Sequence, residues 1–284
     1  MSFVDHIRRC NTCDPGRFVP LLAGGRRIGW LRRDNAAMLA PFPRVFAVEA
    51  ERVDLVASGS VDAVSQAVDE VVEALVADGK VPKWRNETFD VAARWGEPPV
   101  FRLDRGAVPF FGVRAYGVHL NGYRCGQDGR LMLWIGRRAP DKRVDPDKLD
   151  NLVAGGIGNG YGAAATLEKE GGEEAAIPPG LIRRAVPAGA ITYRMETPLG
   201  VRDDVMFVYD LDVPADFTPA NRDGEIVDFR LMPVDAVLDR IRATDDFKFN
   251  VNLVILDFAV RHGLLRPDEP GYLDITGGLH RPLD

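Results

Sequence analysis

The feature that most constrains this chain is a glycine-rich run followed directly by an acidic one, AGGIGNGYGAAATLEKEGGEEAAI at residues 154–177. A helix over the second half would bring Glu170, Glu173 and Glu174 to one face, because residues three and four apart are neighbours there, with Cβ atoms about 5–6 Å apart. Like charges so placed repel unless water solvates the face or a cation gathers the carboxylates. Oxygen ligands of this kind suit Mg²⁺ or Mn²⁺. The three glutamates by themselves favour the solvated face, and a metal site is the alternative.

Two phosphate-binding interpretations of the glycines fit less well. Gly158, Gly160 and Ala163 satisfy the spacing of a dinucleotide-binding fingerprint, which also needs an acidic residue about 20 positions further on. The segment PPGLIRRAVP lies there and contains no acid. A P-loop ends in Gly-Lys-Ser/Thr, whereas Lys169 precedes a glutamate and no hydroxyl is available for magnesium. A glycine loop that cradles phosphate is therefore disfavoured.

Length and composition are those of an ordinary globular protein. The 284 residues suit one large domain or two smaller ones, and the net charge of −6 argues against a general nucleic-acid surface. No apolar run approaches the roughly 20 residues of a membrane helix, and the first residues lack the apolar core of a signal peptide. Three cysteines indicate no disulfide framework. We expect a cytoplasmic protein that binds neither nucleic acid nor membrane.

The hydrophobic pattern predicts a first unit over residues 1–108 and a second over residues 109–284. In the first, FVPLLAGGRRIGWLRR indicates two short strands around Gly24 and Gly25, and helical spacing predicts a helix over 61–78. In the second we expect a hairpin of strands 110–125 and 131–139, a short strand at 150–156, a helix over 163–176, two or three strands within 185–213, and helices over 234–243 and 251–262. Strands and helices mix without a strict βαβ rhythm, so the expected fold class is α+β, with a mixed sheet between helices.

The spacing around the acidic run changes its interpretation. Five residues separate Gly155 from Tyr161, and seven more lead to Lys169-Glu170-Gly-Gly-Glu-Glu-Ala-Ala-Ile, a pattern that resembles the Nudix box. The leading glycine, the three metal-side glutamates and the final aliphatic residue are in register. Four positions depart from the box: Tyr161 replaces a glutamate, Lys169 an arginine, Gly171 an aliphatic residue and Ala176 a glycine.

The flanking segments resemble one branch of that family. FGVRAYGVHLNGY, LWIGRRAPDKRVDPDKLDNLVAGGI, VYDLDVPADFTP and DGEIVDFRLMPVDAV are similar to Nudix proteins related to thiamine pyrophosphokinase, which carry an extra N-terminal domain. FVPLLAGGRRIGWLRR resembles that extra domain, so the likeness extends over roughly residues 18–263. It implies a Nudix α/β/α sandwich with a mixed sheet, preceded by a smaller α+β domain.

The resemblance implies a metal-dependent hydrolase of diphosphate linkages. Its metal ligands, for Mg²⁺ or Mn²⁺, would be Glu170, Glu173 and Glu174, with the carbonyl of Ala154 as an added ligand. The metal would neutralise phosphate oxygens while water attacks phosphorus. Glu174, Glu173 or Glu225 would serve as general base.

The departures from the box bear on catalytic rate. In the family, the arginine replaced here by Lys169 braces a catalytic glutamate, and lysine lacks the planar fork that fixes orientation. Gly171 and Gly172 inside the helix cost roughly 1 kcal/mol each relative to alanine. Ala176 lacks the ease with which glycine adopts a left-handed helix end. A Nudix protein that binds its ligand with little catalysis is therefore a rival hypothesis.

Candidate substrate contacts lie after the second hairpin strand. They are Arg137, Arg138, Trp134, Lys142, Asp150 and Asn151. Arginine pairs suit diphosphate oxygens, although a strand-end pair is as often a plain surface charge, and a tryptophan in an alternating strand is more often core. The branch resemblance suggests a small-molecule substrate like thiamine diphosphate or its oxidised analogues, cleaved to the monophosphate. A nucleoside diphosphate such as ADP-ribose is the alternative, and the N-terminal unit would shape the pocket or support a homodimer.

Overall fold

The computed structural model describes residues 1–82 and 87–283. Within these residues the helices are α1 (Phe3–Arg9), the 3₁₀ turn η1 (Pro15–Arg17), α2 (Arg33–Met38), α3 (Val61–Ala77), α4 (Val108–Phe111), α5 (Ala163–Ala175), α6 (Pro179–Ile182), α7 (Val234–Ala243), α8 (Val251–Arg261) and α9 (Tyr272–Leu279). The strands are β1 (Phe18–Ala23), β2 (Arg26–Arg32), β3 (Phe46–Val48), β4 (Val53–Leu55), β5 (Thr88–Val91), β6 (Phe101–Asp104), β7 (Arg114–Cys125), β8 (Leu131–Arg138), β9 (Leu149–Asp150), β10 (Val153–Gly156), β11 (Val186–Thr197), β12 (Gly200–Asp212) and β13 (Ile226–Pro233).

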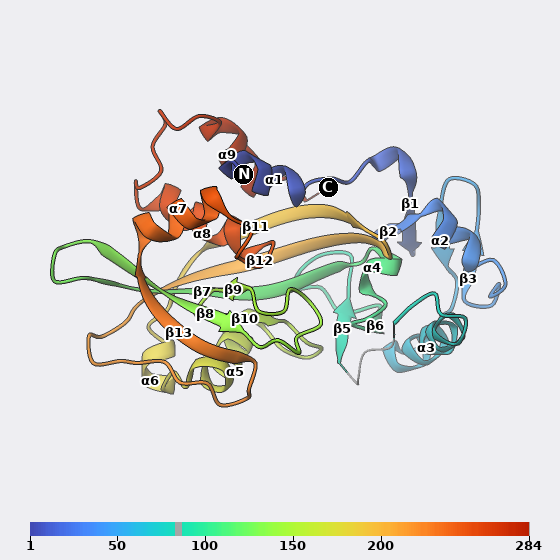
Figure 1. Ribbon diagram of the computed structural model, residues 1–284. Coiled ribbons are helices and arrows are strands. Elements are labelled where there is room, and N and C mark those ends of the chain that lie inside the picture. Colours follow the sequence, from blue (N-terminus) through green and yellow to red (C-terminus); the bar gives the residue numbers. More distant parts are fainter. Residues whose placement is uncertain (83–86, 284) are drawn as a thin grey trace.

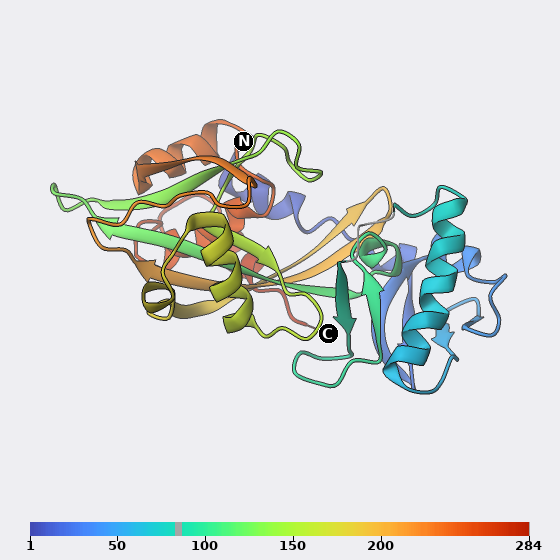
Figure 2. The same ribbon diagram turned by 90° about the horizontal axis from the view of Figure 1, so that it is seen from below.

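A small lobe and a large lobe make up the molecule (Figure 1). The small lobe contains α2, α3, the sheet β2-β1-β4-β3 and the ribbon β5-β6. One apolar core joins α3, through Val68 and Val71, to Phe101 and Leu103 of β6. The long strands β7, β11 and β12 reach from the large lobe to this small one (Figures 1 and 2).

The large lobe is built on one mixed sheet. In the described residues its strands run in the order β11-β12-β7-β8-β13, with β10 added beside β7 and β9 beside β8. β12 and β7 are parallel, whereas β11 with β12, β7 with β8 and β8 with β13 are antiparallel. The expected mixed sheet is confirmed.

Helices cover both faces of this sheet (Figure 1). α1, α7, α8 and α9 lie on one face, where Val254 and Phe258 belong to a core that includes Ile191 and Met206 of the sheet. α5 and α6 lie on the other face, where Leu167 shares a core with Val118 and Leu120. The layers are therefore helix, sheet and helix, and the acidic run lies in one of the covering helices.

The first helix differs from the expected division of the chain. The sequence predicts one unit over residues 1–108, yet Phe3, Val4 and Ile7 of α1 are buried in the core of the large lobe. The Nε2 atom of His6 also lies 2.9 Å from the carbonyl oxygen of Ile241 in α7. Burial of this apolar face stabilises the packing of α1 on the large lobe instead of the small one. The boundary between residues 108 and 109 stays a prediction.

The other predicted elements agree closely with the structure. The strands around Gly24 and Gly25, the helices over 61–78, 163–176, 234–243 and 251–262, and the hairpin across residues 126–130 are confirmed. The first hairpin strand begins at Arg114 and not at residue 110, because Val108–Phe111 form the short helix α4. Two strands, β11 and β12, occupy 185–213. The short strand expected at 150–156 is two strands, β9 and β10, which pair with different neighbours on either side of Asn151.

Candidate functional site

Glu174 is the most deeply buried of the three glutamates on α5. Its side chain is almost inaccessible to water, with 4% of the residue exposed, and its Oε2 accepts a hydrogen bond of 2.9 Å from the backbone N–H of Ala154. Burial raises the pKa of Glu174 well above its usual value, and the nearby carboxylates of Asp150, Glu170 and Glu225 add to the rise. The buried Glu174 carboxylate thus lies near three further acids, and Lys248 is a cation close enough to interact with it.

Glu170 lies against the strand that precedes the helix. A Cβ atom added to Gly155 in β10 would stand 2.4 Å from the Cγ of Glu170, so only glycine permits this approach. Burial raises the pKa of Glu170, and Lys169 partly opposes that rise. The leading glycine of the predicted box therefore has a direct physical role, which is to let the helix glutamate pack on β10.

Lys169 makes contact with both neighbouring carboxylates. Its Nζ donates to Glu170 Oε1 at 3.0 Å and to Glu173 Oε2 at 2.8 Å. Burial by itself would lower the pKa of Lys169, but the hydrogen bonds to Glu173 and Glu170 outweigh it and raise the pKa above its usual value. The side chain of Glu173 is half exposed. The expected pairing of Lys169 with a box glutamate is present, and it engages two of the three predicted metal ligands.

The three predicted glutamate ligands lie on the same helix, but their carboxylates do not point toward one common position for a metal. Across residues 1–82 and 87–283, no three His, Cys, Asp or Glu side chains already surround one point at metal-binding distance. Glu170 and Glu173 are turned to Lys169, and Glu174 is turned to Ala154. Cation binding would require Glu170 or Glu173 to exchange the ammonium for the metal. The assignment of these ligands, and of the Ala154 carbonyl, stays a prediction.

Glu225 approaches the same region from the loop before β13. Its carboxylate forms an ion pair with Lys142, and its backbone carbonyl accepts a hydrogen bond of 2.9 Å from the N–H of Ala139. The Glu225 charge contributes to the raised pKa values of both Glu170 and Glu174. The structure therefore brings Glu225 and Lys142, which are far apart in sequence, to the acidic face of α5.

Three of the predicted substrate contacts are buried beneath this face. Arg138 donates to Asp150 Oδ2 at 2.7 Å and to the backbone carbonyls of Val144 and Asp145 at 2.8 and 3.0 Å. Lys248 lies 3.4 Å from the same Asp150 oxygen. Burial would raise the pKa of Asp150, but Lys248 and Arg138 hold it below its usual value. Arg138 and Asp150 thus face the interior instead of a substrate.

Asn151 continues this interior network through the sheet. Its Oδ1 lies 2.9 Å from His119 Nδ1, and its Nδ2 donates to Asn121 Oδ1 at 2.9 Å. Asn121 in turn donates to Asp210 Oδ1 at 3.0 Å. Burial lowers the pKa of His119 to about 4, so this imidazole is neutral at physiological pH. A chain of fixed polar groups therefore supports β9 and β10 below the helix.

The remaining two candidates have different surroundings. Trp134 is 8% exposed and belongs to the core under α5, as tryptophan in a strand usually does, and its Nε1 has no hydrogen-bond partner. Arg137 is partly exposed and pairs with Asp228 at 2.7 Å and with Asp147 at 3.6 Å. Arg137 is thus the more accessible member of the arginine pair.

The small lobe holds the loop that leads into α5. The backbone N–H of Asn159 donates to the Thr88 carbonyl at 2.9 Å, and its side chain donates to Thr88 Oγ1 at 2.6 Å. The N–H of Gly160 donates to Asp90 Oδ2 at 2.9 Å. Tyr161, at the position where the box has a glutamate, is exposed. β5 of the small lobe therefore fixes the start of the acidic helix.

Comparison with known proteins decides the family. The profile of the NUDIX domain matches residues 116–252, and a "Domain of unknown function (DUF4743)" matches residues 2–115. Nudix hydrolase 20, chloroplastic, from Arabidopsis thaliana is 38% identical over 96% of this chain and 76% of its own length. The chain belongs to the Nudix hydrolase family. It is thus an enzyme of the hydrolase class.

Two further proteins are similar to this chain over different lengths. Nudix hydrolase 24, chloroplastic, also from Arabidopsis thaliana, is 37% identical over 96% of this chain and 76% of its own length. The crystal structure of DR0079 from Deinococcus radiodurans covers 60% of this chain and 98% of its own, with 23% identity and a TM-score of 0.45. The Nudix assignment and the extra N-terminal domain are confirmed by the plant relatives and the two profiles.

Localisation and partners stay predictions. The plant Nudix hydrolases are named chloroplastic, which describes those proteins alone. In the described part of the chain, none of the helices has the length and apolar character needed to cross a bilayer.

Sequence reasoning missed several residues of this Nudix site. Lys248 and His119 lie in the buried network, and Thr88 and Asp90 hold the box loop from the other lobe. The segment DDFKFN around Lys248 matches no motif, and His119 lies in a strand that reads as core. The pairing of Glu225 with Lys142 also has no signal in the sequence, because 83 positions separate the two residues.

Proposed function

We propose that this Nudix hydrolase cleaves a diphosphate linkage of a small molecule at the acidic face of α5. Glu170, Glu173 and Glu174 would hold Mg²⁺ or Mn²⁺ there, with the Ala154 carbonyl as a further ligand. The observation that carries the proposal is the buried Glu174 carboxylate, fixed by the Ala154 N–H at 2.9 Å and close to the carboxylates of Glu170 and Glu225. Such a donor set of oxygen atoms fits a hard divalent cation.

The charges around the helix support the need for that cation. Burial raises the pKa of both Glu170 and Glu174, so an added cation would favour their ionised forms. When bound, the metal would neutralise diphosphate oxygens and lower the pKa of a bound water. The buried pair of Asp150 and Lys248 holds β9 beneath α5. This pair therefore helps to position the carboxylates of the proposed ligands on that helix.

Glu225 is our candidate for the general base, with Glu173 and Glu174 as the alternatives inside the box. Glu225 is about half exposed and held by Lys142, so its carboxylate can contact water while the ion pair keeps it in place. Glu174 is buried and bonded to Ala154, which suits a ligand that stays in place. We assign Lys169 the role of orienting Glu170 and Glu173.

The substrate-side candidates divide by accessibility. Arg137 and Lys142 have exposed parts and could bind phosphate oxygens. Arg138, Asp150 and Asn151 are buried, and we assign them positioning roles beneath the site instead of substrate contact. Trp134 packs in the core and would act only through the packing of α5.

Thiamine diphosphate or an oxidised analogue is the substrate we propose, with the monophosphate as product. The flanking segments resemble the branch related to thiamine pyrophosphokinase. An aromatic cluster also lies beside the box loop: the Trp95 ring is 4.6 Å from Tyr116 and 4.8 Å from Phe207, and the Tyr116 carbonyl accepts from the N–H of Ile157 at 2.9 Å. Trp95 is partly exposed, and aromatic faces attract a cationic ring such as thiazolium.

A hydrolysis screen tests the reaction and the substrate separately. Thiamine diphosphate, its oxo and oxy analogues and ADP-ribose would each be incubated with the enzyme and Mg²⁺ or Mn²⁺, with EDTA as the control, and the products separated. We expect metal-dependent monophosphate formation from a thiamine compound. Cleavage of ADP-ribose alone would overturn the substrate and keep the reaction class, whereas no metal-dependent turnover of any compound would overturn both.

A weakly catalytic, ligand-binding Nudix protein is the second candidate. It is favoured by one observation, the contact of Lys169 with both Glu170 and Glu173, which occupies two predicted metal ligands. In that case the same compounds would bind and raise the melting temperature while the screen detects no product. Binding without turnover would therefore select this candidate.

A further inference from the structure

The loop of the Nudix box that leads into α5 contains no acidic residue in this chain. Residues 154–162 are AGGIGNGYG, and Tyr161 stands where the box has glutamate. The side chain of Tyr161 is exposed, and Gly162, the N-cap residue of α5, has no side chain that could accept from the first N–H groups of the helix. The loop therefore has no carboxylate of its own to hold its backbone.

A carboxylate of the small lobe reaches this loop instead. Asp90 of β5 accepts a hydrogen bond of 2.9 Å from the N–H of Gly160 through its Oδ2. Its Oδ1 lies 3.7 Å from the Nε of Arg102, the residue opposite Asp90 in the paired strand β6. This ion pair across the ribbon helps to keep the carboxylate turned to the loop. Gly160 has a φ of 76°, a conformation that glycine adopts without strain.

Two further residues of β5 contact the same loop. Thr88 accepts from Asn159 twice, through its carbonyl at 2.9 Å and its Oγ1 at 2.6 Å. Phe89, which is buried in the core of the small lobe, lies against Gly156. A Cβ added to Gly156 would stand 3.0 Å from the Cζ of the Phe89 ring. Together with the acid described above, three consecutive residues of β5 therefore hold the loop.

The loop is continuous with the backbone that contacts the proposed metal ligands. Gly156 follows Gly155, against which the side chain of Glu170 packs. The N–H of Ala154, one residue earlier, donates to Glu174 at 2.9 Å. A shift of the loop away from β5 would therefore disturb the contacts that place both glutamates.

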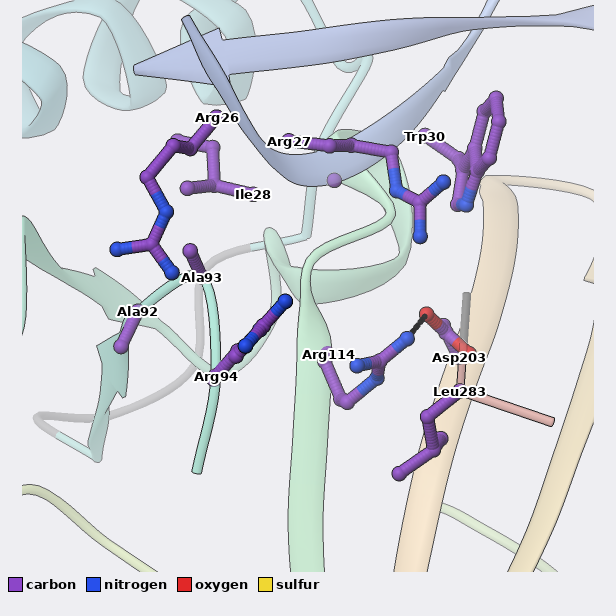
Figure 3. A pocket seen from close by; sticks show the side chains of 11 residues that line it. Arg26, Arg27, Ile28, Trp30, Ala92, Ala93, Arg94, Arg114, Asp203 and Leu283 are labelled. Atoms are coloured by element: carbon purple, nitrogen blue, oxygen red, sulfur yellow. Dashed lines mark hydrogen bonds and ion pairs between the residues drawn. The ribbon is translucent and has the colours of Figure 1, made fainter. Parts of the chain in front are cut away.

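The segment that follows β5 lies where the small lobe meets the large one. In Figure 3, residues 92–94 face a cavity of about 330 Å³ together with Arg114, which begins β7, and Asp203 of β12. Arg114 and Asp203 form an ion pair at 3.0 Å. The N–H of Trp30 in β2 donates to the Gly112 carbonyl at 3.0 Å, and a Cβ added to Gly112 would stand 2.0 Å from the Trp30 carbonyl oxygen. The lobes are thus in direct backbone contact, and β5 reaches the loop from a fixed position.

We propose that the small lobe supplies the carboxylate that the loop of this Nudix box lacks, and that Asp90 and Thr88 thereby keep Glu170 and Glu174 where they bind the metal. The inference rests on the proposed function, which makes these two glutamates metal ligands. Asp90 and Thr88 are positioning residues, because they act through the backbone of the loop and not through contact with substrate or metal. The N-terminal lobe is then a part of the catalytic unit.

Amide hydrogen exchange in the metal-free full chain tests the contact without any substrate. Wild type, Asp90→Ala, Asp90→Asn and Asp54→Ala would be compared by NMR in EDTA. Asp54 of β4 is a matched control, because its side chain is 28% exposed, against 35% for Asp90, and it pairs with Arg52 in the same lobe. The Gly160 amide should exchange about tenfold faster in Asp90→Ala. It should change less than about twofold in Asp54→Ala and in Asp90→Asn, which keeps an acceptor.

Metal affinity and turnover show whether this contact matters for the site. Mn²⁺, titrated by calorimetry without substrate, should bind about tenfold more weakly to Asp90→Ala, because the ligands are less well placed. At saturating Mg²⁺, kcat should fall about tenfold while KM changes less than about twofold. Asp90→Asn should restore most of both losses, and Asp54→Ala should behave as wild type. A circular dichroism spectrum checks that each variant is folded.

The outcomes separate this inference from the proposed reaction. Equal Gly160 exchange and equal Mn²⁺ affinity in Asp90→Ala and Asp54→Ala would overturn the positioning role, whether or not a substrate is known. Faster exchange with unchanged Mn²⁺ affinity would overturn it too, because the loop would then be held without effect on the ligands. A wild-type protein that binds Mn²⁺ but hydrolyses no diphosphate would overturn the proposed reaction alone, and exchange with Mn²⁺ titration would still decide the role of Asp90. Absence of Mn²⁺ binding to the wild type would overturn both.

Discussion

Gly155 and Glu170 are in such close contact that a single added carbon atom would separate them. The Cβ of an alanine at position 155 would stand 2.4 Å from Glu170 Cγ and 2.6 Å from its Cδ. This contact joins β10 to the helix that carries all three predicted metal ligands. It shows how the first residue of the box controls the place of a glutamate fifteen positions later.

Gly155→Ala should therefore damage catalysis more than stability. The displaced Glu170 carboxylate would leave its ligand position, and a displacement of about 1 Å can cost about 100-fold in rate. Metal-dependent turnover and the free energy of unfolding would be measured in the same preparation. Gly158→Ala is the control, because its nearest neighbour is the Thr88 carbonyl at an ordinary 3.8 Å. Equal turnover in the two variants would show that this contact does not position Glu170.

The two glycines inside α5 should respond in opposite ways to alanine. A Cβ on Gly171 would meet Ile182 Cδ1 of α6 at 2.9 Å, whereas a Cβ on Gly172 meets no atom within 4 Å. Gly172→Ala should stabilise the fold by about 1 kcal/mol, because alanine is the better helix former. In Gly171→Ala, the clash with Ile182 should outweigh this gain in helix stability, so the variant should be less stable than the wild type. Chemical denaturation measures both, and a stabilised Gly171→Ala variant would contradict the packing.

Lys169→Arg should raise the catalytic rate. Lysine divides one ammonium between Glu170 and Glu173, whereas the planar guanidinium holds one carboxylate with two parallel bonds. An improvement of about 1 kcal/mol in orientation corresponds to roughly a fivefold increase in kcat. The affinity for Mg²⁺, measured by titration, should change less than kcat. An unchanged or lower kcat would show that Lys169 does not limit the reaction.

His119 should make stability depend on pH in a defined window. Its pKa is about 4 in the fold because of burial and about 6.5 when unfolded, so the unfolded state binds a proton first as the pH falls. The stability contributed at pH 7 is lost between pH 6.5 and pH 4, by about 3 kcal/mol in total. His119→Asn keeps a donor toward Asn151 and cannot titrate. Urea unfolding at pH 7 and pH 4.5 should show a smaller loss in the variant, and equal losses would contradict this assignment.

The sequence predicted the elements of the large lobe well because its apolar residues repeat at strand and helix spacing. The helix over 163–176 is one example, since Leu167 and Ala175 are buried at the positions its period requires. Ala176 adopts a left-handed conformation, with φ of 54°, at the helix end where the box has glycine. A local pattern thus identified both the helix and its unfavourable last residue.

The side-chain network could not be predicted from the same patterns. Arg138 and Arg137 are neighbours in sequence, yet one is buried against Asp150 and the other is exposed beside Asp228, because successive residues of a strand point to opposite faces. Lys248 reaches Asp150 across 98 positions. The reason for Gly171, which is the approach of Ile182, likewise depends on a helix elsewhere in the chain. Such contacts arise from tertiary packing and leave no local pattern.

The central claim, that the buried acids of α5 carry a metal-dependent hydrolysis, is tested most directly by Glu174→Gln. Turnover of the best diphosphate substrate would be measured at saturating Mg²⁺ in the wild type, in Glu174→Gln and in Glu168→Gln, a surface glutamate of the same helix paired with Arg183. We predict a loss of at least about 100-fold for Glu174→Gln and little change for Glu168→Gln. The melting temperature of Glu174→Gln should be equal or higher, because a buried charge is removed. Full turnover by a folded Glu174→Gln enzyme would contradict the account.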